Sequence, residues 1–155
     1  MPSALAIELP SEGATAALAA RLAGLARAGD VIALKGPLGS GKTTFARAFI
    51  RARLGTHEEV PSPTFTLVET YGSVPPQIWH FDLFRLERPE DVWELGIEDA
   101  LAGGISLIEW PERMGALLPR ERLEIEFAFG AAPDARTAVL APSPSWAGRI
   151  GDPLV

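Results

Sequence analysis

The sequence predicts an α/β fold in which a mostly parallel β-sheet carries helices on both faces and includes some antiparallel strands. Short apolar runs alternate with segments of helical periodicity, as expected for parallel strands joined by crossover helices. A glycine-rich segment leads directly from one apolar run into a helical segment. Two later apolar runs each end on a carboxylate, and ligands of such folds bind beyond the carboxyl ends of the strands.

The composition is that of a globular domain. The chain has 155 residues, of which 47% are apolar, enough to bury a core without disulfides. We expect a single domain at residues 1–141 and a flexible C-terminal tail at 142–155, where Pro, Ser and Gly dominate. The lack of cysteine, of a signal-like N-terminus and of a long apolar run predicts a cytoplasmic protein with no membrane partner.

The N-terminal part of the chain predicts a strand, a helix and a second strand. Residues 4–9 resemble a short edge strand. Ser11 is suited to cap the helix that follows, and Gly29 is suited to end it. Residues 31–35 form a continuous apolar run, which is typical of a buried parallel strand. The apolar residues at helical spacing between these two strands are Leu18, Leu22 and Leu25.

A second helix is predicted over residues 42–54, with Gly55 as its stop signal. Prolines beyond it exclude a helix, and residues 65–71 have β-rich character. A turn at 72–76 then leads into a strand at 77–82. The predicted buried face of the helix consists of Phe45, Ala48, Phe49 and Ala52.

The remaining elements alternate in the same way. A proline followed by two acids opens a helix at 89–95, and a short helix is predicted at 97–102. Residues 105–110 form an apolar strand that a proline ends. Residues 122–129 and 136–141 predict two further strands, paired as a hairpin.

The segment from Gly36 to Thr44 reads G-P-L-G-S-G-K-T-T, which matches the phosphate-binding pattern G-x-x-x-x-G-K-[ST] between a strand and a helix. Its glycines permit a curved backbone whose N–H groups surround an anion. Lys42 is expected to reach the β- and γ-phosphates of a nucleoside triphosphate, and the Thr43 hydroxyl to hold Mg²⁺. The expected cofactor-binding residues of this loop are Gly36, Gly39, Ser40, Gly41, Lys42, Thr43 and Thr44.

Asp82 and Glu109 each end an apolar strand, so both are candidate catalytic residues and, with Thr43, candidate metal ligands. Nucleotide hydrolysis needs a carboxylate for Mg²⁺ and a group that orients water. We favour Asp82 for the metal and Glu109 for the water, although the two roles can be exchanged. Thr64 is a third catalytic candidate because a rigid loop threonine can sense the γ-phosphate; ordinary turn chemistry explains it equally well.

Four neighbouring residues have two interpretations each. Arg85 and Arg88 are suited to neutralise phosphate charge, but pairing with nearby acids explains them equally well. His80 shares a strand face with Asp82, which favours a structural hydrogen bond over a catalytic role. Trp110 is a cofactor-binding candidate because it can stack on a base, and it can equally contact a partner or pack internally.

Four blocks of the sequence together resemble the successive motifs of the bacterial TsaE (YjeE) ATPases. They begin at Gly36 (GPLGSGKTTF), Ser62 (SPTFTLV), His80 (HFDLFRL) and Ile108 (IEWPE), and their order and spacing match that family. One departure is Phe84, which stands where the family usually has tyrosine. The missing hydroxyl questions a polar role at that position, not the fold.

The resemblance implies a P-loop NTPase-like fold and a slow ATPase that uses ATP and Mg²⁺. TsaE proteins support synthesis of threonylcarbamoyladenosine (t6A) in tRNA, docking on the transferase subunit (TsaD) and its inactive paralogue (TsaB). The net charge of −6 argues against autonomous binding to tRNA, so tRNA is expected to be reached only through that complex. The family's site residues carry over to Lys42, Thr43, Thr64, Asp82, Glu109 and Trp110.

Three other classes of protein share parts of this pattern. A small-molecule kinase has the same loop and sheet, but kinases usually add an arginine-rich lid, and no clear segment of that kind is present. A GTPase is disfavoured because the guanine-reading segment N-K-x-D is absent. A module that binds nucleotide only as a structural ligand is the third alternative, and turnover stimulated by partners distinguishes it from an ATPase.

Overall fold

The computed structural model describes residues 4–55 and 67–151, which form one β-sheet flanked by helices. The strands are β1 (Leu5–Leu9), β2 (Val31–Lys35), β3 (Val68–Tyr71), β4 (Ile78–Asp82), β5 (Ile105–Glu109), β6 (Leu123–Phe129) and β7 (Arg136–Pro142). Their order across the sheet is β1-β7-β6-β2-β5-β4-β3. Strand β2, which leads into the glycine-rich loop, therefore lies in the middle.

The centre of the sheet is parallel. Strand β2 pairs in parallel with β5 on one side and with β6 on the other, and β5 pairs in parallel with β4. The outer pairings are antiparallel: β7 with β6, β1 with β7, and β3 with β4. These pairings confirm the predicted α/β fold with a mostly parallel sheet, and they confirm the predicted hairpin of β6 and β7.

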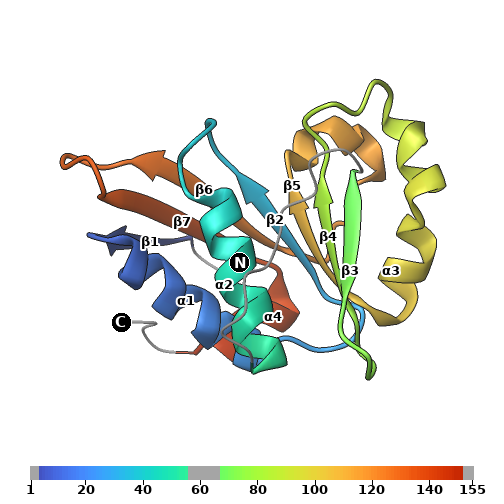
Figure 1. Cartoon of the computed structure of the whole chain (residues 1–155), viewed down its shortest axis with the longest axis horizontal. Helices are drawn as coiled ribbons and strands as arrows, with labels where there is room; N and C mark the ends of the chain where they lie inside the picture. Colours follow the sequence, from blue (N-terminus) through green and yellow to red (C-terminus); the bar gives the residue numbers. More distant parts are fainter. Residues whose placement is uncertain (1–3, 56–66, 152–155) are drawn as a thin grey trace.

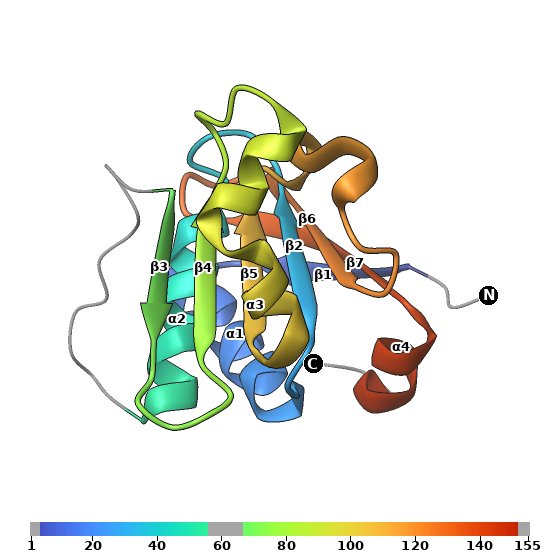
Figure 2. The ribbon, with the colours of Figure 1, turned by 90° about the vertical axis from the view of Figure 1, so that its right-hand side faces the viewer.

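Helices cover both faces of the sheet. They are α1 (Glu12–Leu25), α2 (Lys42–Leu54), α3 (Ile97–Gly103) and α4 (Pro144–Ile150), with 3₁₀ helices η1 (Pro89–Leu95) and η2 (Pro111–Leu117). Helices α1, α2 and α4 lie on one face, and α3, η1 and η2 on the other (Figures 1 and 2). None of the helices within residues 4–55 and 67–151 combines the length and the apolar character needed to cross a membrane.

Alternate residues of the central strands serve two separate cores. In β2, Ile32 and Leu34 belong to the core under α1 and α2, whereas Val31 belongs to the core under α3. In β5, Leu107 and Ile108 divide in the same way. Strands that are buried on both faces are held from two sides, so the residues at their carboxyl ends occupy well-defined positions.

The first helix begins as predicted and ends earlier. The Ser11 hydroxyl accepts a hydrogen bond from the Ala14 N–H at 3.2 Å, which confirms the predicted N-cap. The helix stops at Leu25, before the predicted stop at Gly29. Gly29 instead takes a φ of 90° in the turn that enters β2, so the glycine marks a turn and not the helix end.

The buried face of α2 is rotated from the predicted one. Phe45 and Phe49 are buried as expected, but Ala52 is exposed. Helix α2 packs against both the sheet and α1, and its buried stripe includes Ala46 and Ile50. Ala52 lies just outside this buried stripe. Successive residues of a helix are rotated by about 100°, so a residue three positions after Phe49 does not lie directly above it.

Two short 3₁₀ helices differ from the prediction, one in its type and one in having no predicted counterpart. The helix predicted at 89–95 is the 3₁₀ helix η1, which ends at Gly96 with a φ of 85°. Helix η2, after β5, was not predicted. Its kink at Gly115, where φ is 53°, interrupts the regular spacing on which helix prediction depends.

The segment after β7 is helical, so the predicted flexible tail at 142–155 is wrong for residues 144–150. Trp146 of α4 is 1% exposed and belongs to the core that α1 also lines. Arg149 stacks over the Trp146 ring at 4.1 Å and binds Asp30 with both terminal nitrogens, at 2.6 and 2.9 Å. A low-complexity composition concealed these two anchoring residues, whose partners lie far away in the chain.

Candidate functional site

The glycine-rich loop crosses the carboxyl end of β2 and is pressed against β6. Gly36 has a φ of 138°, and a Cβ at this position would lie 2.6 Å from the carbonyl oxygen of Phe127. Gly41, with a φ of 113°, is the N-cap of α2. Both positions therefore require glycine, the first for space and conformation and the second for conformation. Three glycines of the loop, Gly36, Gly39 and Gly41, have positive φ values, so the backbone turns sharply between β2 and α2.

Lys42 folds back over the loop. Its ammonium group donates hydrogen bonds to the carbonyl oxygens of Gly36 and Pro37, the latter at 3.4 Å. It also lies 3.4 Å from the centroid of the Trp110 ring. Burial lowers the pKa of Lys42, and the negative charges of Glu109, Glu112 and Asp82 oppose this shift.

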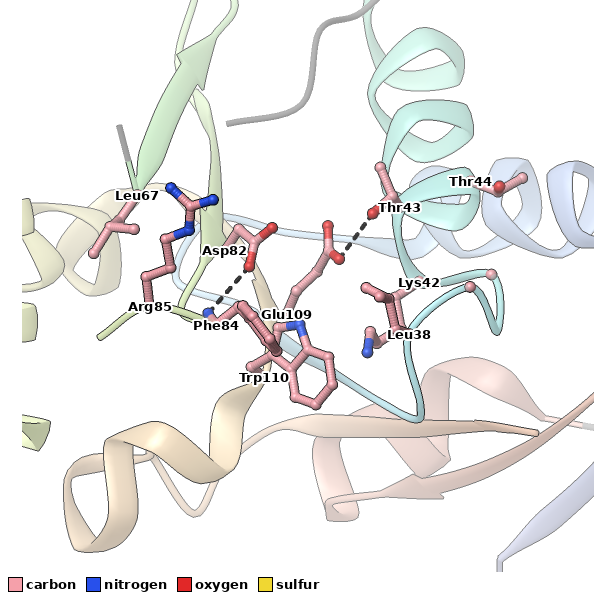
Figure 3. Close-up of a pocket in the computed structure, with 12 residues that line it drawn as sticks. Leu38, Lys42, Thr43, Thr44, Leu67, Asp82, Phe84, Arg85, Glu109 and Trp110 are labelled. Carbon is pink, nitrogen blue, oxygen red and sulfur yellow. Dashed lines mark hydrogen bonds between the residues drawn. The ribbon is translucent and has the colours of Figure 1, made fainter. Parts of the chain in front are cut away.

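Glu109 connects three elements of the site. The Thr43 hydroxyl, at the start of α2, donates a hydrogen bond of 2.9 Å to one carboxylate oxygen (Figure 3). The other oxygen lies 2.7 Å from Nε2 of His80 on β4. Glu109 is 2% exposed and His80 is fully buried. Both oxygens of this carboxylate are thus engaged at the point where α2, β4 and β5 converge.

Asp82 lies beside Glu109, because the two residues are register partners at the ends of β4 and β5. One oxygen of Asp82 accepts the backbone N–H of Phe84 at 3.1 Å (Figure 3). Burial raises the pKa of Asp82, and repulsion from Glu109 adds to the shift, whereas the Phe84 hydrogen bond, His80 and Lys42 oppose it. The Asp82 carboxyl therefore holds its proton to a higher pH than an ordinary aspartate does, because its pKa is raised.

The raised pKa of Asp82 makes a prediction about stability. Because the folded protein holds this proton more tightly than the unfolded chain, stability falls as pH rises through the folded pKa. The substitution Asp82→Asn keeps the acceptor for the Phe84 N–H and removes the charge. We expect a higher Tm than wild type at pH 7 without Mg²⁺, and equal Tm values below the ordinary pKa of 3.8.

Circular dichroism melts over a pH series measure this difference, with Asp134→Asn in the exposed turn between β6 and β7 as the matched control. A lower Tm for Asp82→Asn than for wild type at pH 7 contradicts the prediction.

A pocket of about 270 Å³ lies between the loop and the ends of β4 and β5. Its lining residues are Leu38, Gly39, Gly41, Lys42, Thr43, Thr44, Leu67, Asp82, Phe84, Arg85, Glu109 and Trp110. Most of the predicted site residues are therefore brought together. Gly36 and Ser40 do not line this pocket, and the Ser40 hydroxyl is buried without a hydrogen-bond partner in the described residues. Thr64 lies outside the described residues.

Trp110 forms a wall of the pocket in an unusual conformation. Its φ of 60° is the only positive value for a non-glycine residue in the described parts of the chain. The indole ring packs against Phe84, with ring centroids 5.0 Å apart, and its face is directed at Lys42. Such a conformation costs free energy and is retained where surrounding contacts determine it. Phe84 therefore has an apolar packing role here, in keeping with its missing hydroxyl.

Several contacts at the site lacked a local signal in the sequence. Leu38 and Leu67 line the pocket, and Arg136 of β7 donates a hydrogen bond of 3.2 Å to the Gly39 carbonyl. The two arginines that had two interpretations each have different surroundings. Arg85 lines the pocket, whereas Arg88 pairs with acids of η1. Only the folded structure reveals such long-range contacts.

Comparison with known proteins places these features in one family. The family model described as "Threonylcarbamoyl adenosine biosynthesis protein TsaE" matches residues 9–137. A crystal structure of YdiB from Bacillus subtilis superimposes with a TM-score of 0.78 at 30% sequence identity, covering 96% of this chain and 93% of that one. The fold and the family model agree.

Sequence relatives give the same result. The chain is 43% identical over 117 residues to the "tRNA threonylcarbamoyladenosine biosynthesis protein TsaE" of Rickettsia conorii, covering 76% of this chain and 67% of that protein. The protein of the same name from Bacillus subtilis is 39% identical over 112 residues, covering 72% of this chain and 69% of the relative. The range matched by the family model contains the loop, both strand-end acids and Trp110. The chain belongs to the TsaE family.

Proposed function

We propose that this protein is a P-loop ATPase that binds and slowly hydrolyses Mg-ATP in support of t6A synthesis in tRNA. Its proposed partners are a threonylcarbamoyl transferase subunit of the TsaD type and the inactive paralogue of the TsaB type. The observation that carries the proposal is the convergence of Lys42, Thr43 and Glu109 between a glycine loop and two strand ends. Family membership supplies the connection to tRNA modification.

The residues of the pocket fit a triphosphate and Mg²⁺. The cation prefers hard oxygen ligands and is commonly held by one or two carboxylates together with substrate phosphates. Thr43, Asp82 and Glu109 supply such oxygens, although no group of three or more His, Asp or Glu side chains in the described residues is arranged to hold a metal alone. Bound Mg²⁺ neutralises charge on the phosphates and assists their transfer to water.

The two carboxylates differ in ways that support distinct roles. Glu109 accepts the Thr43 hydroxyl, and a P-loop threonine of this position is a Mg²⁺ ligand in such loops. We therefore assign the cation to Thr43 and Glu109. Asp82 has one oxygen held by a backbone N–H and a raised pKa, which suits a group that orients a water molecule and receives its proton. This assignment exchanges the two roles favoured from sequence.

Lys42 must change its contacts to serve this function. Its ammonium group donates to two loop carbonyls, and the same charge is suited to bind the β- and γ-phosphates of ATP. The exposed apolar side chains of Leu38 and Phe84 beside the pocket support closure of the site by a protein partner. Slow turnover in isolation and faster turnover with partners follow from such an open site.

Release of free phosphate tests the proposal. The purified protein is incubated with ATP and Mg²⁺, with and without the TsaD- and TsaB-type partners, and phosphate is measured over time. We expect slow release that partners accelerate and that chelation of Mg²⁺ abolishes. Transfer of phosphate to a small-molecule acceptor instead supports the kinase alternative, and no release under any of these conditions refutes the ATPase.

Binding to tRNA is expected to be weak in the isolated protein. The net charge of −6 disfavours approach to a phosphate backbone, because such binding depends on an excess of Lys and Arg that neutralises phosphates. A filter-binding assay at physiological salt should show a Kd no tighter than about 10⁻⁴ M, at the weak end of nonspecific binding. The partner complex without this protein serves as the comparison. A micromolar or tighter Kd for the isolated chain overturns the prediction.

A further inference from the structure

We propose that His80 is a positioning residue that fixes the Glu109 carboxylate for Mg-ATP, an inference that rests on the function proposed above. His80 lies on β4 and Glu109 on β5, and the ring Nε2 lies 2.7 Å from the Glu109 oxygen that Thr43 does not contact. The two residues are near neighbours on one face of the sheet, since His80 pairs with Leu107.

The His80 contact and the Thr43 contact together hold both oxygens of the Glu109 carboxylate. Thr43 binds one oxygen at 2.9 Å and His80 binds the other at 2.7 Å, so rotation of the carboxylate breaks one of the two bonds. Asp82, by comparison, has a hydrogen bond from the Phe84 backbone to one oxygen. Groups that hold a metal ligand from behind fix its orientation, and their loss commonly weakens metal binding.

Burial of His80 argues for a specific polar role. The side chain is fully buried, and its Nδ1 has no hydrogen-bond partner in the described residues. A proton on Nε2 satisfies Glu109 and leaves Nδ1 as an unpaired acceptor, whereas a proton on Nδ1 leaves a buried donor unpaired and two acceptors facing each other. The geometry thus points to a proton on Nε2 that His80 donates to Glu109.

The proposal predicts which replacements preserve the function. The side-chain amide nitrogen of glutamine can reach the position of Nε2. The asparagine side chain is one methylene group shorter, so its amide nitrogen cannot. His80→Asn should therefore raise the Mg²⁺ concentration needed for half-maximal ATP binding by about 10- to 100-fold, the range found for groups that orient metal ligands. His80→Gln should restore most of this loss. ATP binding in the presence of EDTA should be equal in all variants, because the loop and Lys42 are unchanged.

Ser106→Ala is the matched control. Ser106 is also fully buried and also has an unpartnered polar atom among the described residues, but it points to the opposite face of the sheet. Calorimetric titrations of ATP at several Mg²⁺ concentrations compare the variants, and circular dichroism verifies folding. The proposal is refuted if His80→Asn shows the Mg²⁺ dependence of wild type, or if Ser106→Ala shows the same loss.

A second measurement uses the wild-type protein without nucleotide. Nitrogen NMR of the imidazole rings distinguishes the two neutral tautomers, and since the chain has two histidines, the His80→Gln spectrum identifies the signals. We expect the Nε2–H tautomer, and a shift of that resonance on Glu109→Gln substitution. An Nδ1–H tautomer overturns the inference even where His80→Asn does not fold. A wild type that fails to bind Mg-ATP refutes the proposed function, and the tautomer readout does not depend on that outcome.

Discussion

Replacement of Lys42 by alanine should lower the affinity for ATP by at least about thirtyfold. Loss of one partner from a buried charge pair costs about 2–5 kcal/mol, and each 1.4 kcal/mol is a factor of about ten. Lys42 is 4% exposed and is the lysine that lines the pocket between the loop and the strand ends. Isothermal titration calorimetry with ATP and Mg²⁺ measures the loss directly.

The chain provides its own control for this experiment. Lys35, the other lysine of the sequence, ends strand β2 and pairs with Glu124 at 3.7 Å, and it does not line this pocket. Lys35→Ala should bind ATP as wild type does. Unchanged affinity in Lys42→Ala, in a protein that melts as wild type does, would show that the triphosphate binds elsewhere.

Substitution of the two strand-end acids should separate binding from turnover. Glu109→Gln should reduce Mg²⁺-dependent ATP binding together with turnover, because it removes the carboxylate charge beside the Thr43 hydroxyl, which donates a hydrogen bond to Glu109. Asp82→Asn should leave binding nearly intact and lower kcat by about 10²- to 10⁴-fold, the range for loss of a general base or of a charge-stabilising group. Equilibrium titration and single-turnover hydrolysis measure the two effects separately.

Glu124→Gln serves as the control for the two acids, because Glu124 lies on β6 of the same sheet, pairs with Arg122 and Lys35, and does not line the pocket. It should leave both binding and turnover unchanged. If Asp82→Asn loses Mg-ATP binding while Glu109→Gln loses only kcat, the roles are those favoured from sequence. Normal single-turnover hydrolysis in both acid variants contradicts either assignment.

Elements with strong local patterns were predicted well. Strands β2, β4 and β5 are apolar runs between clear turn signals, and the order of strands and helices limited the topology to a parallel centre. Elements whose partners lie far away in sequence were not. Trp146 resides in a segment rich in Pro, Ser and Gly, and its helix is stabilised by packing against α1. The composition of a segment does not reveal which distant residues it will pack against.

The candidate site shows the same division. The loop, Thr43 and the two acids were identified because one local motif and the edge rule for parallel strands are sufficient to bring them together. The sequence favoured Asp82 for the metal and Glu109 for the water but left an exchange of the two roles open, since both residues end equivalent strands. It depends on side-chain distances: which carboxylate reaches Thr43, and which one His80 holds. Distances of that kind follow from packing, not from spacing along the chain.

The position of β1 has a consequence for biosynthesis. In the register of the sheet, Leu5 pairs with Leu140 and Leu9 with Arg136, so β1 has β7 as its partner strand. Strand β1, the first strand of the described residues, must therefore wait until nearly all of the described chain has been translated. Contacts between segments so distant in the chain form slowly and leave an unpaired strand exposed meanwhile. Until then the nascent protein is exposed to aggregation or to capture by a chaperone at this edge, although its glycine-rich loop has long been synthesised.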